Sequence, residues 1–478
     1  MIVVWIILAI IIVVVAIITI NTIRFKPYPE PAQVDLKTIV PKDKVKRDMV
    51  DMIRCKTVSN RNDELVDWGE FEKFRNLLVE RFPLVHEKAT LEHIGKSGLL
   101  YHIKGEASDK PSVLMAHYDV VPVEQKDWTE PAFEGLIKDD CIWGRGTMDT
   151  KGTLCAIFEA LEVLLADGYV PKQDLYLSFS GEEEIDGDSC PEIVKRLEEM
   201  GVTPAFVLDE GGAVVENVFP GVHKKCAVVG TSEKGSVNLD FTLNAKGGHA
   251  SAPPVKSLCG KLADAITAIE KHPFKGELTP SVAGMFDTLG RHSSVLYRML
   301  FSNLWCFKPV LDMICKKSGG ELNAMMRSTV AITRMEGSKA YNVMPSTASF
   351  SANMRLLGSD TIDSAVEYLN KVIDNDDIKI SVVNGMNPSI TSDINCEGYE
   401  NLSMVIKSTW PEAVVTPYLM MACSDSRHYC RITDKVYRFS AMEMSRRERA
   451  MIHGVDERIP LNTLYKTVEF YERMMQML

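Results

Sequence analysis

Apolar and polar residues follow two different periods along the chain. Over residues 68–81, apolar side chains recur every three or four positions and place Phe71, Phe74, Leu77 and Leu78 on one face, which predicts an amphipathic helix. A second, more strongly periodic helix is predicted over 150–166. Short apolar runs predict strands at 98–103, 113–116, 175–179 and 205–208. Strands that alternate with helices predict an α/β fold, with a mostly parallel sheet covered by helices.

The pattern changes near Gly230. Alternating segments at 235–245, 328–335 and 347–355, a further strand at 378–383 and helices at 256–271 and 360–373 predict a four-stranded antiparallel sheet with two helices. This α+β unit interrupts the first pattern, which resumes at about Asn401. Residues 286–317 are rich in Met, Leu, Trp and Phe and predict an extra helical element of the insert. Its apolar side chains indicate a core or an interface, and an apolar substrate channel stays open as the alternative.

The N-terminal stretch is almost continuously apolar, and no charged side chain occurs between Ile2 and Ile23. As a helix it would be about 33 Å long, enough to cross a bilayer core of about 30 Å. A signal peptide would have a basic start, a shorter apolar region and a cleavage site, so a retained single-pass anchor is the favoured interpretation. Arg24, Lys26 and Lys37 follow the span, and by the positive-inside rule they place the rest of the chain in the cytoplasm.

The length of 478 residues is too great for one compact core, so we expect several units. The predicted division is an anchor at 1–23, a stiff proline-rich tether at 24–40, the first part of the α/β domain at 41–230, the α+β insert at 231–386 and the second part of the α/β domain at 387–478.

Composition narrows the function further. The chain is 46% hydrophobic and 25% charged, and its net charge of −11 argues against a nucleic-acid partner, which needs a basic surface. Its 11 cysteines are scattered without any Cys-x-x-Cys pair, which indicates neither a disulfide framework nor a zinc ribbon. Reduced thiols are expected instead, and they favour a reducing compartment.

Histidine and acidic residues follow the predicted strands, where ligands gather in open α/β sheets. Taken singly, each could be a helix cap or a solvated turn. Taken together they supply two imidazoles and three carboxylates, a set that suits two zinc-like ions sharing a bridging carboxylate. The set is His117, Asp149, Glu184, Glu210 and His453. Asp119, two residues after His117, can hold the tautomer of that histidine. A further carboxylate beside a ligand would serve as general base.

The order of the motifs resembles one known family. The motifs are His-x-Asp-Val-Val-Pro, Gly-Arg-Gly-x-x-Asp-x-Lys-Gly, an acidic triplet, Asp-Glu-Gly, Gly-Gly-His-Ala-Ser and His-x-x-Asp-Glu. From about Val45 to the C-terminus the chain resembles the aminoacylase / carboxypeptidase S / glutamate carboxypeptidase family of di-zinc metallopeptidases. The resemblance implies a catalytic α/β domain interrupted by a lid domain that often dimerises. Residues 286–327 and the sequence Arg-Ser-Thr-Val-Ala-Ile-Thr from Arg327 are most similar to the carboxypeptidase S and N-acyl-amino-acid hydrolase branch.

The resemblance also implies roles for the metal ligands. His117 and Glu210 would bind one ion, Glu184 and His453 the other, and Asp149 would bridge them. Asp119 would orient His117, and Glu183 would be the general base. The implied cofactors are two divalent ions, most often zinc, with cobalt or manganese as alternatives. The family has Asp-Glu-Glu where this chain has Glu182-Glu183-Glu184, so a one-residue shift in base and ligand stays open.

In the insert, His249 resembles a histidine that reaches the active site of a partner subunit and polarises the scissile carbonyl, which implies a homodimer through the lid. Asn342 and Arg355 match positions that contact substrate, and Arg427 lies in a loop that resembles the receiver of the substrate carboxylate. The planar guanidinium of arginine can hold a carboxylate by two hydrogen bonds. For either arginine, a surface ion pair stays the alternative.

The expected function is therefore a metal-dependent amidohydrolase that releases an amino acid from a short peptide or an N-acyl amino acid. A dipeptidase or aminopeptidase of the same family is one alternative. The other is a membrane-tethered relative that binds metal without catalysis.

Overall fold

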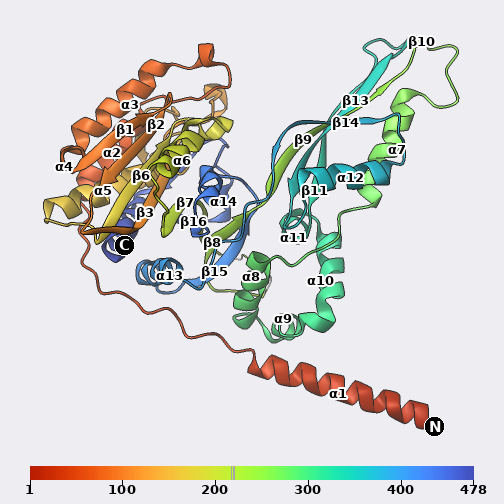
Figure 1. Ribbon diagram of the computed structural model, residues 1–478, viewed down its shortest axis with the longest axis horizontal. Coiled ribbons are helices and arrows are strands. Elements are labelled where there is room, and N and C mark those ends of the chain that lie inside the picture. Colours follow the sequence, from red (N-terminus) through yellow and green to blue (C-terminus); the bar gives the residue numbers. More distant parts are fainter. Residues whose placement is uncertain (217, 219–220) are drawn as a thin grey trace.

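The computed structural model describes residues 1–216, 218 and 221–478, and two sheets organise it (Figure 1). The larger sheet has eight strands in the order β1-β2-β6-β3-β7-β16-β8-β15. These strands are β1 (Ala89–Ile94), β2 (Gly98–Ile103), β3 (Ala107–His117), β6 (Gln173–Ser180), β7 (Phe206–Val215), β8 (Cys226–Glu233), β15 (Val414–Met420) and β16 (Val436–Glu443).

The α/β class is confirmed, but the sheet is mixed rather than mostly parallel. The central strands β6, β3, β7 and β16 pair in parallel, as does β15 with β8. The pairs β1–β2, β2–β6 and β7–β8 are antiparallel. β1 and β2 are antiparallel because the connection between them is short, whereas a parallel pair needs a crossover of a dozen or more residues.

Alternate side chains of β2 and β3 enter two separate cores. Leu99, Tyr101 and Leu114 belong to the core on one face, whereas Leu100 and Val113 belong to the core on the other. The first face is covered by α2 (Lys42–Ile53), α3 (Trp68–Arg81), α4 (Pro83–Lys88), α5 (Lys151–Ala166), α13 (Glu397–Thr409) and α15 (Leu461–Met477). The second face is covered by α6 (Ser189–Glu199). Each fully buried apolar side chain contributes about 1.5–3 kcal/mol.

The insert contains the predicted four-stranded antiparallel sheet, in the order β11-β13-β9-β14. Its strands are β9 (Gly235–Asn244), β11 (Thr329–Glu336), β13 (Thr347–Leu356) and β14 (Lys379–Met386), and its helices are α7 (Leu258–Lys271) and α12 (Ile362–Ile373). Alternate residues of β9 face the helices, and the rings of Phe241 and Phe350 stack at 4.2 Å. The chain passes from one sheet to the other at Lys234, between β8 and β9.

The apolar stretch 286–317 is helical, as predicted. The helices here are α8 (Pro280–Arg291), α9 (Val295–Phe301), α10 (Leu304–Ser318) and α11 (Gly320–Met326). α8 packs on β15 of the eight-stranded sheet, with Val282, Met285 and Phe286 buried in the large core. Phe286, Leu289 and Leu311 of the stretch are buried in this large core, in line with the favoured interpretation as core. The stretch is wrongly predicted as part of the insert, because its buried side chains pack with the eight-stranded sheet and not in the core of the insert.

α1 (Ile2–Arg24) projects from the body (Figure 1) and buries none of its 23 residues. Its mean hydropathy of 3.5 and its length would allow it to cross a membrane. The segment that follows is bound to the body. The Arg291 guanidinium lies 4.2 Å from the ring centre of Phe25 and 3.8 Å from that of Tyr28, and Glu30 pairs with Lys407 at 2.7 Å. Further along, the Val34 N–H donates to the Ser408 hydroxyl and the Ile39 N–H to the Glu472 carboxylate, each at 2.7 Å, so both ends of the predicted tether contact the body.

Three short elements complete the site and the tip of the insert. A three-stranded sheet joins β4 (Leu136–Lys138), β5 (Cys141–Trp143) and β17 (Arg458–Pro460), and a two-stranded ribbon joins β10 (Gly248–His249) and β12 (Val343–Met344). α14 is Arg446–Arg449. The pairing of β17 with β5 brings the segment after His453 beside the glycine-rich segment that ends at Asp149. All eleven cysteines are described, and each is a free thiol.

Candidate metal centre

His117 ends β3 and its buried ring faces a group of carboxylates. Its Nε2 lies 2.9 Å from Asp149 Oδ1 and 3.5 Å from Glu210 Oε1. Its Nδ1 lies 3.0 Å from the backbone oxygen of Asp119 and can donate a proton to it. That hydrogen bond leaves Nε2 free of a proton in the neutral ring, which is the form that binds a metal ion.

Asp149 lies between the two predicted histidine ligands. Its Oδ1 faces His117, and its Oδ2 lies 3.0 Å from His453 Nε2. His453 Nε2 is in turn 2.8 Å from Glu184 Oε2. The fold therefore brings the five predicted ligands into one cluster, with the Asp149 carboxylate in the position that a bridge between two ions would need.

The three consecutive glutamates point in different directions. Glu182 turns away from the cluster and accepts hydrogen bonds from Ser97, at 2.9 Å, and from Ser189. Glu183 Oε2 lies 4.0 Å from His117 Nε2, and Glu184 faces His453. Two groups of side chains have ligand atoms within 4.8 Å of one another and could hold an ion: His117 with Asp149 and Glu184, and His117 with Glu183 and Glu210.

The electrostatics of the cluster suit a cation. Burial raises the pKa of Glu183 and of Glu184, and it raises the pKa of Glu210 to about 8. Hydrogen bonds to Asp149 and Glu184 raise the pKa of His453 to about 10. Among the described residues, the buried Glu184 Oε1 has no hydrogen-bond partner. Crowded carboxylates with an unpaired oxygen are stabilised by a divalent ion, so the donor set fits the metals that the sequence predicts.

Asp119 connects the two halves of the cluster. One carboxylate oxygen lies 3.3 Å from His117 Nδ1. The two oxygens accept hydrogen bonds from the backbone N–H groups of Glu183 and Glu184, each at 3.1 Å. Asp119 is fully buried, so these contacts are shielded from water. It holds both the histidine and the acidic turn.

Glu210 is presented by a bulge in β7. In the pairing of β16 with β7, Arg438 is opposite Asp209 and the next residue, Phe439, is opposite Gly212, so Glu210 and Gly211 are the extra residues. Gly211 has a φ of 135°, and a Cβ there would lie 2.6 Å from Met420 Sδ and 2.9 Å from Arg438 Cβ. The glycine after Glu210 is thus required by the backbone.

Glu457 is a positioning residue to which the sequence reasoning assigned no role. Its buried carboxylate forms an ion pair with Arg145 at 2.6 Å. It also accepts hydrogen bonds from backbone N–H groups of the glycine-rich segment, among them those of Gly146 at 3.0 Å and Asp149 at 3.3 Å. It therefore fixes the loop that carries Asp149 beside the loop that carries His453. The signal was present in the His-x-x-Asp-Glu motif, whose last residue is Glu457.

The two predicted substrate arginines meet at one loop. The Arg427 side chain is buried, lies 3.7 Å from Glu233 and donates to the Asn387 carbonyl at 2.7 Å. Arg355 donates to Cys423 Sγ at 3.4 Å. Because its side chain is buried, Arg427 is not in a surface ion pair, which was the alternative for this arginine. The same loop carries Asp425, which the sequence reasoning passed over: burial raises its pKa to about 8, and its Oδ2 is buried without a partner in the part of the chain described.

His249 and Asn342 lie outside the cluster, at the tip of the insert. They belong to the β10–β12 ribbon and its flank, where Ala250 N–H donates to the Asn342 carbonyl at 3.1 Å. The His249 ring is exposed and hydrogen-bonded to Ser251. The ribbon stands at the end of the four-stranded unit farthest from the eight-stranded sheet (Figure 1), so the chain does not bring these residues to its own cluster.

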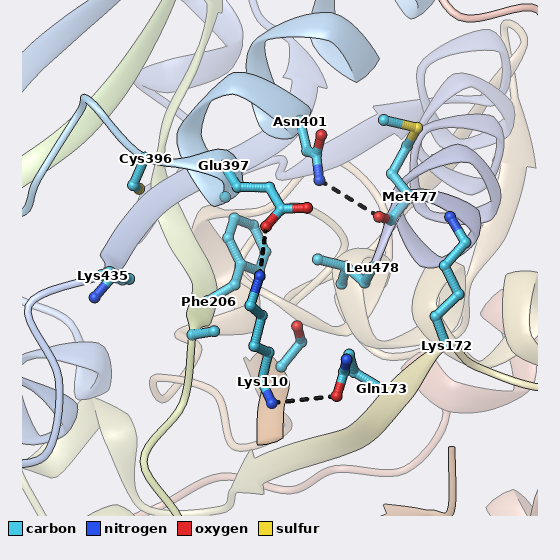
Figure 2. Close-up of a pocket in the computed structure, with 13 residues that line it drawn as sticks. Lys110, Lys172, Gln173, Phe206, Cys396, Glu397, Asn401, Lys435, Met477 and Leu478 are labelled. Carbon is cyan, nitrogen blue, oxygen red and sulfur yellow. Dashed lines mark hydrogen bonds and ion pairs between the residues drawn. The ribbon is translucent and has the colours of Figure 1, made fainter. Parts of the chain in front are cut away.

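A cavity of about 430 Å³ lies at the opposite end of the parallel strands (Figure 2). It is lined by Lys110 near the start of β3, Gln173 at the start of β6 and Phe206 at the start of β7, whereas His117 ends β3. Lys110 there pairs with Glu397 at 3.1 Å. Since ligands of α/β sheets bind at the carboxyl ends, we assign the chemistry to the His117 cluster and not to this cavity.

The chain is similar to known proteins in sequence and in fold. Residues 113–477 match the sequence model of Peptidase family M20/M25/M40. The chain is 35% identical over 470 residues to a probable carboxypeptidase S-like 2 of Dictyostelium discoideum, covering 95% of this chain and 90% of that one. It is 33% identical over 435 residues to the N-fatty-acyl-amino acid synthase/hydrolase PM20D1 of Xenopus tropicalis, covering 89% and 84%. The fold is similar to that of an M20 family metallo-carboxypeptidase, Sso-CP2 of Sulfolobus solfataricus, with a TM-score of 0.68, 18% identity, and coverage of 91% of this chain and 98% of that one.

Proposed function

The chain belongs to Peptidase family M20/M25/M40 and is a metal-dependent amidohydrolase, and we propose that its substrates are N-acyl amino acids with apolar acyl groups. The observation that carries the chemistry is the position of Asp149 between His117 and His453, at 2.9 and 3.0 Å. Support for the acyl group comes from the relative named N-fatty-acyl-amino acid synthase/hydrolase, which matches 89% of this chain. Short peptides with a free C-terminus are the second substrate class.

Two divalent ions are part of this proposal, with zinc as the first choice and cobalt or manganese as alternatives. His117 and Glu210 would hold one ion, Glu184 and His453 the other, and Asp149 both. The unpaired Glu184 Oε1 supports this assignment. Bound there, the ions would supply Lewis acidity that lowers the pKa of a water molecule and polarises an amide carbonyl.

In this proposal the side chains of the protein transfer a proton and hold the reacting groups in position. Glu183 takes a proton from the attacking water molecule while the oxygen of that water bonds to the carbonyl carbon. Glu183 then passes the proton to the amide nitrogen as the C–N bond breaks. The products are a carboxylic acid and an amino acid. Burial raises the pKa of Glu183, which suits a group that must hold a proton between the two steps. Asp119 keeps His117 and the Glu183 backbone in place.

Arg355 and Arg427 are proposed to bind the carboxylate of the released amino acid, supported by their shared position at the 423–427 loop. His249 and Asn342 lie on the remote ribbon, so their proposed roles on substrate require a second copy of the chain. We therefore also propose that the unit over 231–386 is a lid through which two chains associate. The exposed Val343 in this ribbon and the exposed Tyr341 two residues before it support that contact.

The proposed location is a membrane, with α1 as a single-pass anchor and the body in the cytoplasm. Support comes from the length and hydropathy of α1 and from Arg24 and Lys26 directly after it.

Amino-acid release by the full chain tests the function. The purified protein in detergent micelles is given Zn²⁺ and a panel of N-acyl amino acids, dipeptides and N-blocked dipeptides, beside its Glu183→Gln variant. Release of an amino acid from N-acyl members by the parent protein alone is the expected result. Preference for a free N-terminal amine would favour the dipeptidase alternative. Bound metal with no release from any member would favour a catalytically silent relative.

A further inference from the structure

α10 is apolar on two opposite faces. Its inner face buries Leu311 and Cys315. Its outer face leaves Trp305, Val310, Met313 and Ile314 exposed, at 60%, 39%, 61% and 42%. At 3.6 residues per turn these four side chains span about half of the helix surface. α10 also carries the exposed Lys308, Lys316 and Lys317, so its outer side combines apolar and basic side chains, as helices that lie in a membrane interface do.

α9, which is in contact with α10, also has exposed apolar side chains. Val295 and Leu296, at its first turn, are exposed at 73% and 68%. We call the six side chains of α9 and α10 the apolar face: Val295, Leu296, Trp305, Val310, Met313 and Ile314. Large exposed apolar side chains grouped on two helices in contact indicate a contact site.

The end of α1 is seated beside the turn between α9 and α10 (Figure 1). Asn303, which is fully buried at this turn, accepts a hydrogen bond from Asn21 Nδ2 at 2.9 Å and donates to the Ile18 carbonyl at 3.3 Å. Thr22 and Ser302 are joined by a further hydrogen bond of 3.3 Å. The contact thus falls on the last two turns of α1.

The body cannot swing freely about this contact. Arg291 of α8 donates to the Lys26 carbonyl at 2.8 Å and to the Tyr28 hydroxyl at 2.8 Å, and the buried Phe25 lies beneath its guanidinium. α9 and α10 therefore stay at the level at which α1 would leave a bilayer. Trp305 and the exposed Lys308 and Lys317 are residue types that favour that interfacial depth.

We propose that the apolar face of α9 and α10 is a second membrane contact, which lies in the headgroup and upper acyl region of the leaflet through which α1 exits. This inference rests on the proposed anchor, because the depth of α9 and α10 is set by α1. The occupant is a phospholipid bilayer.

Photolabelling of the full chain in phospholipid nanodiscs tests the proposal. A phosphatidylcholine with a diazirine near the top of one acyl chain is irradiated, and the modified peptides are identified by mass spectrometry. We expect lipid adducts on α1 and on residues 295–314, and none at the exposed apolar residues Leu65 and Val170 of the α/β body. Adducts on α1 alone would overturn the second contact and leave the anchor standing. Absence of adducts from α1 would overturn the anchor, and this inference with it.

A double variant, Val295→Ser with Leu296→Ser, separates lipid contact from proximity. Both side chains are exposed and neither belongs to the cluster, so folding and hydrolysis should not depend on them. Adducts on residues 295–314 should fall several-fold while adducts on α1 and hydrolysis of a water-soluble substrate stay unchanged. The control pair is Leu65→Ser with Val170→Ser. Cross-links between two chains at the apolar face, in place of lipid adducts, would show that a second copy covers it and would overturn the proposal.

Discussion

The carboxylate of Asp119 accepts a hydrogen bond from the backbone N–H of Glu183 at 3.1 Å. It also lies 3.3 Å from the ring nitrogen of His117 that faces away from the cluster. One buried side chain therefore sets the position of the proposed base and of a proposed ligand. Removal of such a partner typically lowers metal affinity or activity about 10- to 100-fold.

Asp119→Ala should show a loss of that size, in kcat, in Zn²⁺ affinity or in both. Asp119→Asn keeps one acceptor oxygen and should lose less. Steady-state kinetics with metal analysis of each protein check this. Equal activity of the alanine variant and the parent would exclude the positioning role.

Glu183→Gln should lower kcat about 10²- to 10⁴-fold, because the amide cannot carry the proton from water to the leaving nitrogen. The metal content should stay that of the parent protein. Glu182→Gln is the matched control, since the Glu182 carboxylate contacts Ser97 and Ser189 outside the cluster. If Glu182→Gln were the inactive variant, the base and ligand would be shifted by one residue.

Glu457→Ala should destabilise the protein by about 3–5 kcal/mol, because it leaves the buried Arg145 guanidinium without its carboxylate partner. Unfolding by denaturant measures the change. Glu92→Gln is the comparison: it breaks a half-exposed pair with Arg196 and should cost less than about 1 kcal/mol. Similar costs for both variants would contradict a structural role of Glu457 at the Asp149 loop.

Protons compete with metal ions for the cluster. Burial raises the pKa of Glu210 to about 8, and the hydrogen bonds of His453 raise its pKa to about 10. At neutral pH the metal-free ligands therefore hold protons that metal binding must displace. The apparent affinity for Zn²⁺ should rise with pH as these groups lose their protons. Titration calorimetry in two buffers of different ionisation enthalpy measures the protons released, and binding without proton release would contradict the assignment. A chelator should abolish turnover, and added Zn²⁺ should restore it.

Gly211→Ala should disturb the bulge that presents Glu210, because the new Cβ would lie 2.9 Å from the Cβ of Arg438, which cannot move independently of its backbone. We expect loss of metal affinity together with a lower midpoint of unfolding. Gly168→Ala is the control: its φ is also positive, but no described atom lies within 4 Å of the added Cβ. It should cost only the backbone strain of about 1–2 kcal/mol and leave metal binding unchanged.

The sequence by itself determined the local elements and the list of candidate ligands. The period of apolar residues predicted α3 at its observed bounds, Trp68–Arg81, and β2 at Gly98–Ile103. The acids and histidines at the ends of strands are local features too, and His117, Asp149, Glu184, Glu210 and His453 do gather in one cluster. Their roles as ligands stay predictions.

Only the tertiary structure decided which side chains meet across the chain. Consecutive glutamates have the same local chemistry, and the serines that turn Glu182 away lie in other segments. The contact between Glu457 and Arg145 joins residues 312 positions apart. α10 has apolar side chains on its outward face as well as on its buried face, and the packing of α10 in the fold, against α9 and α11 among others, decides which are buried. A periodic pattern specifies that a residue is apolar or charged and on which face of its own element it lies. What it faces depends on the pairing of distant segments, which the packing of the whole chain sets.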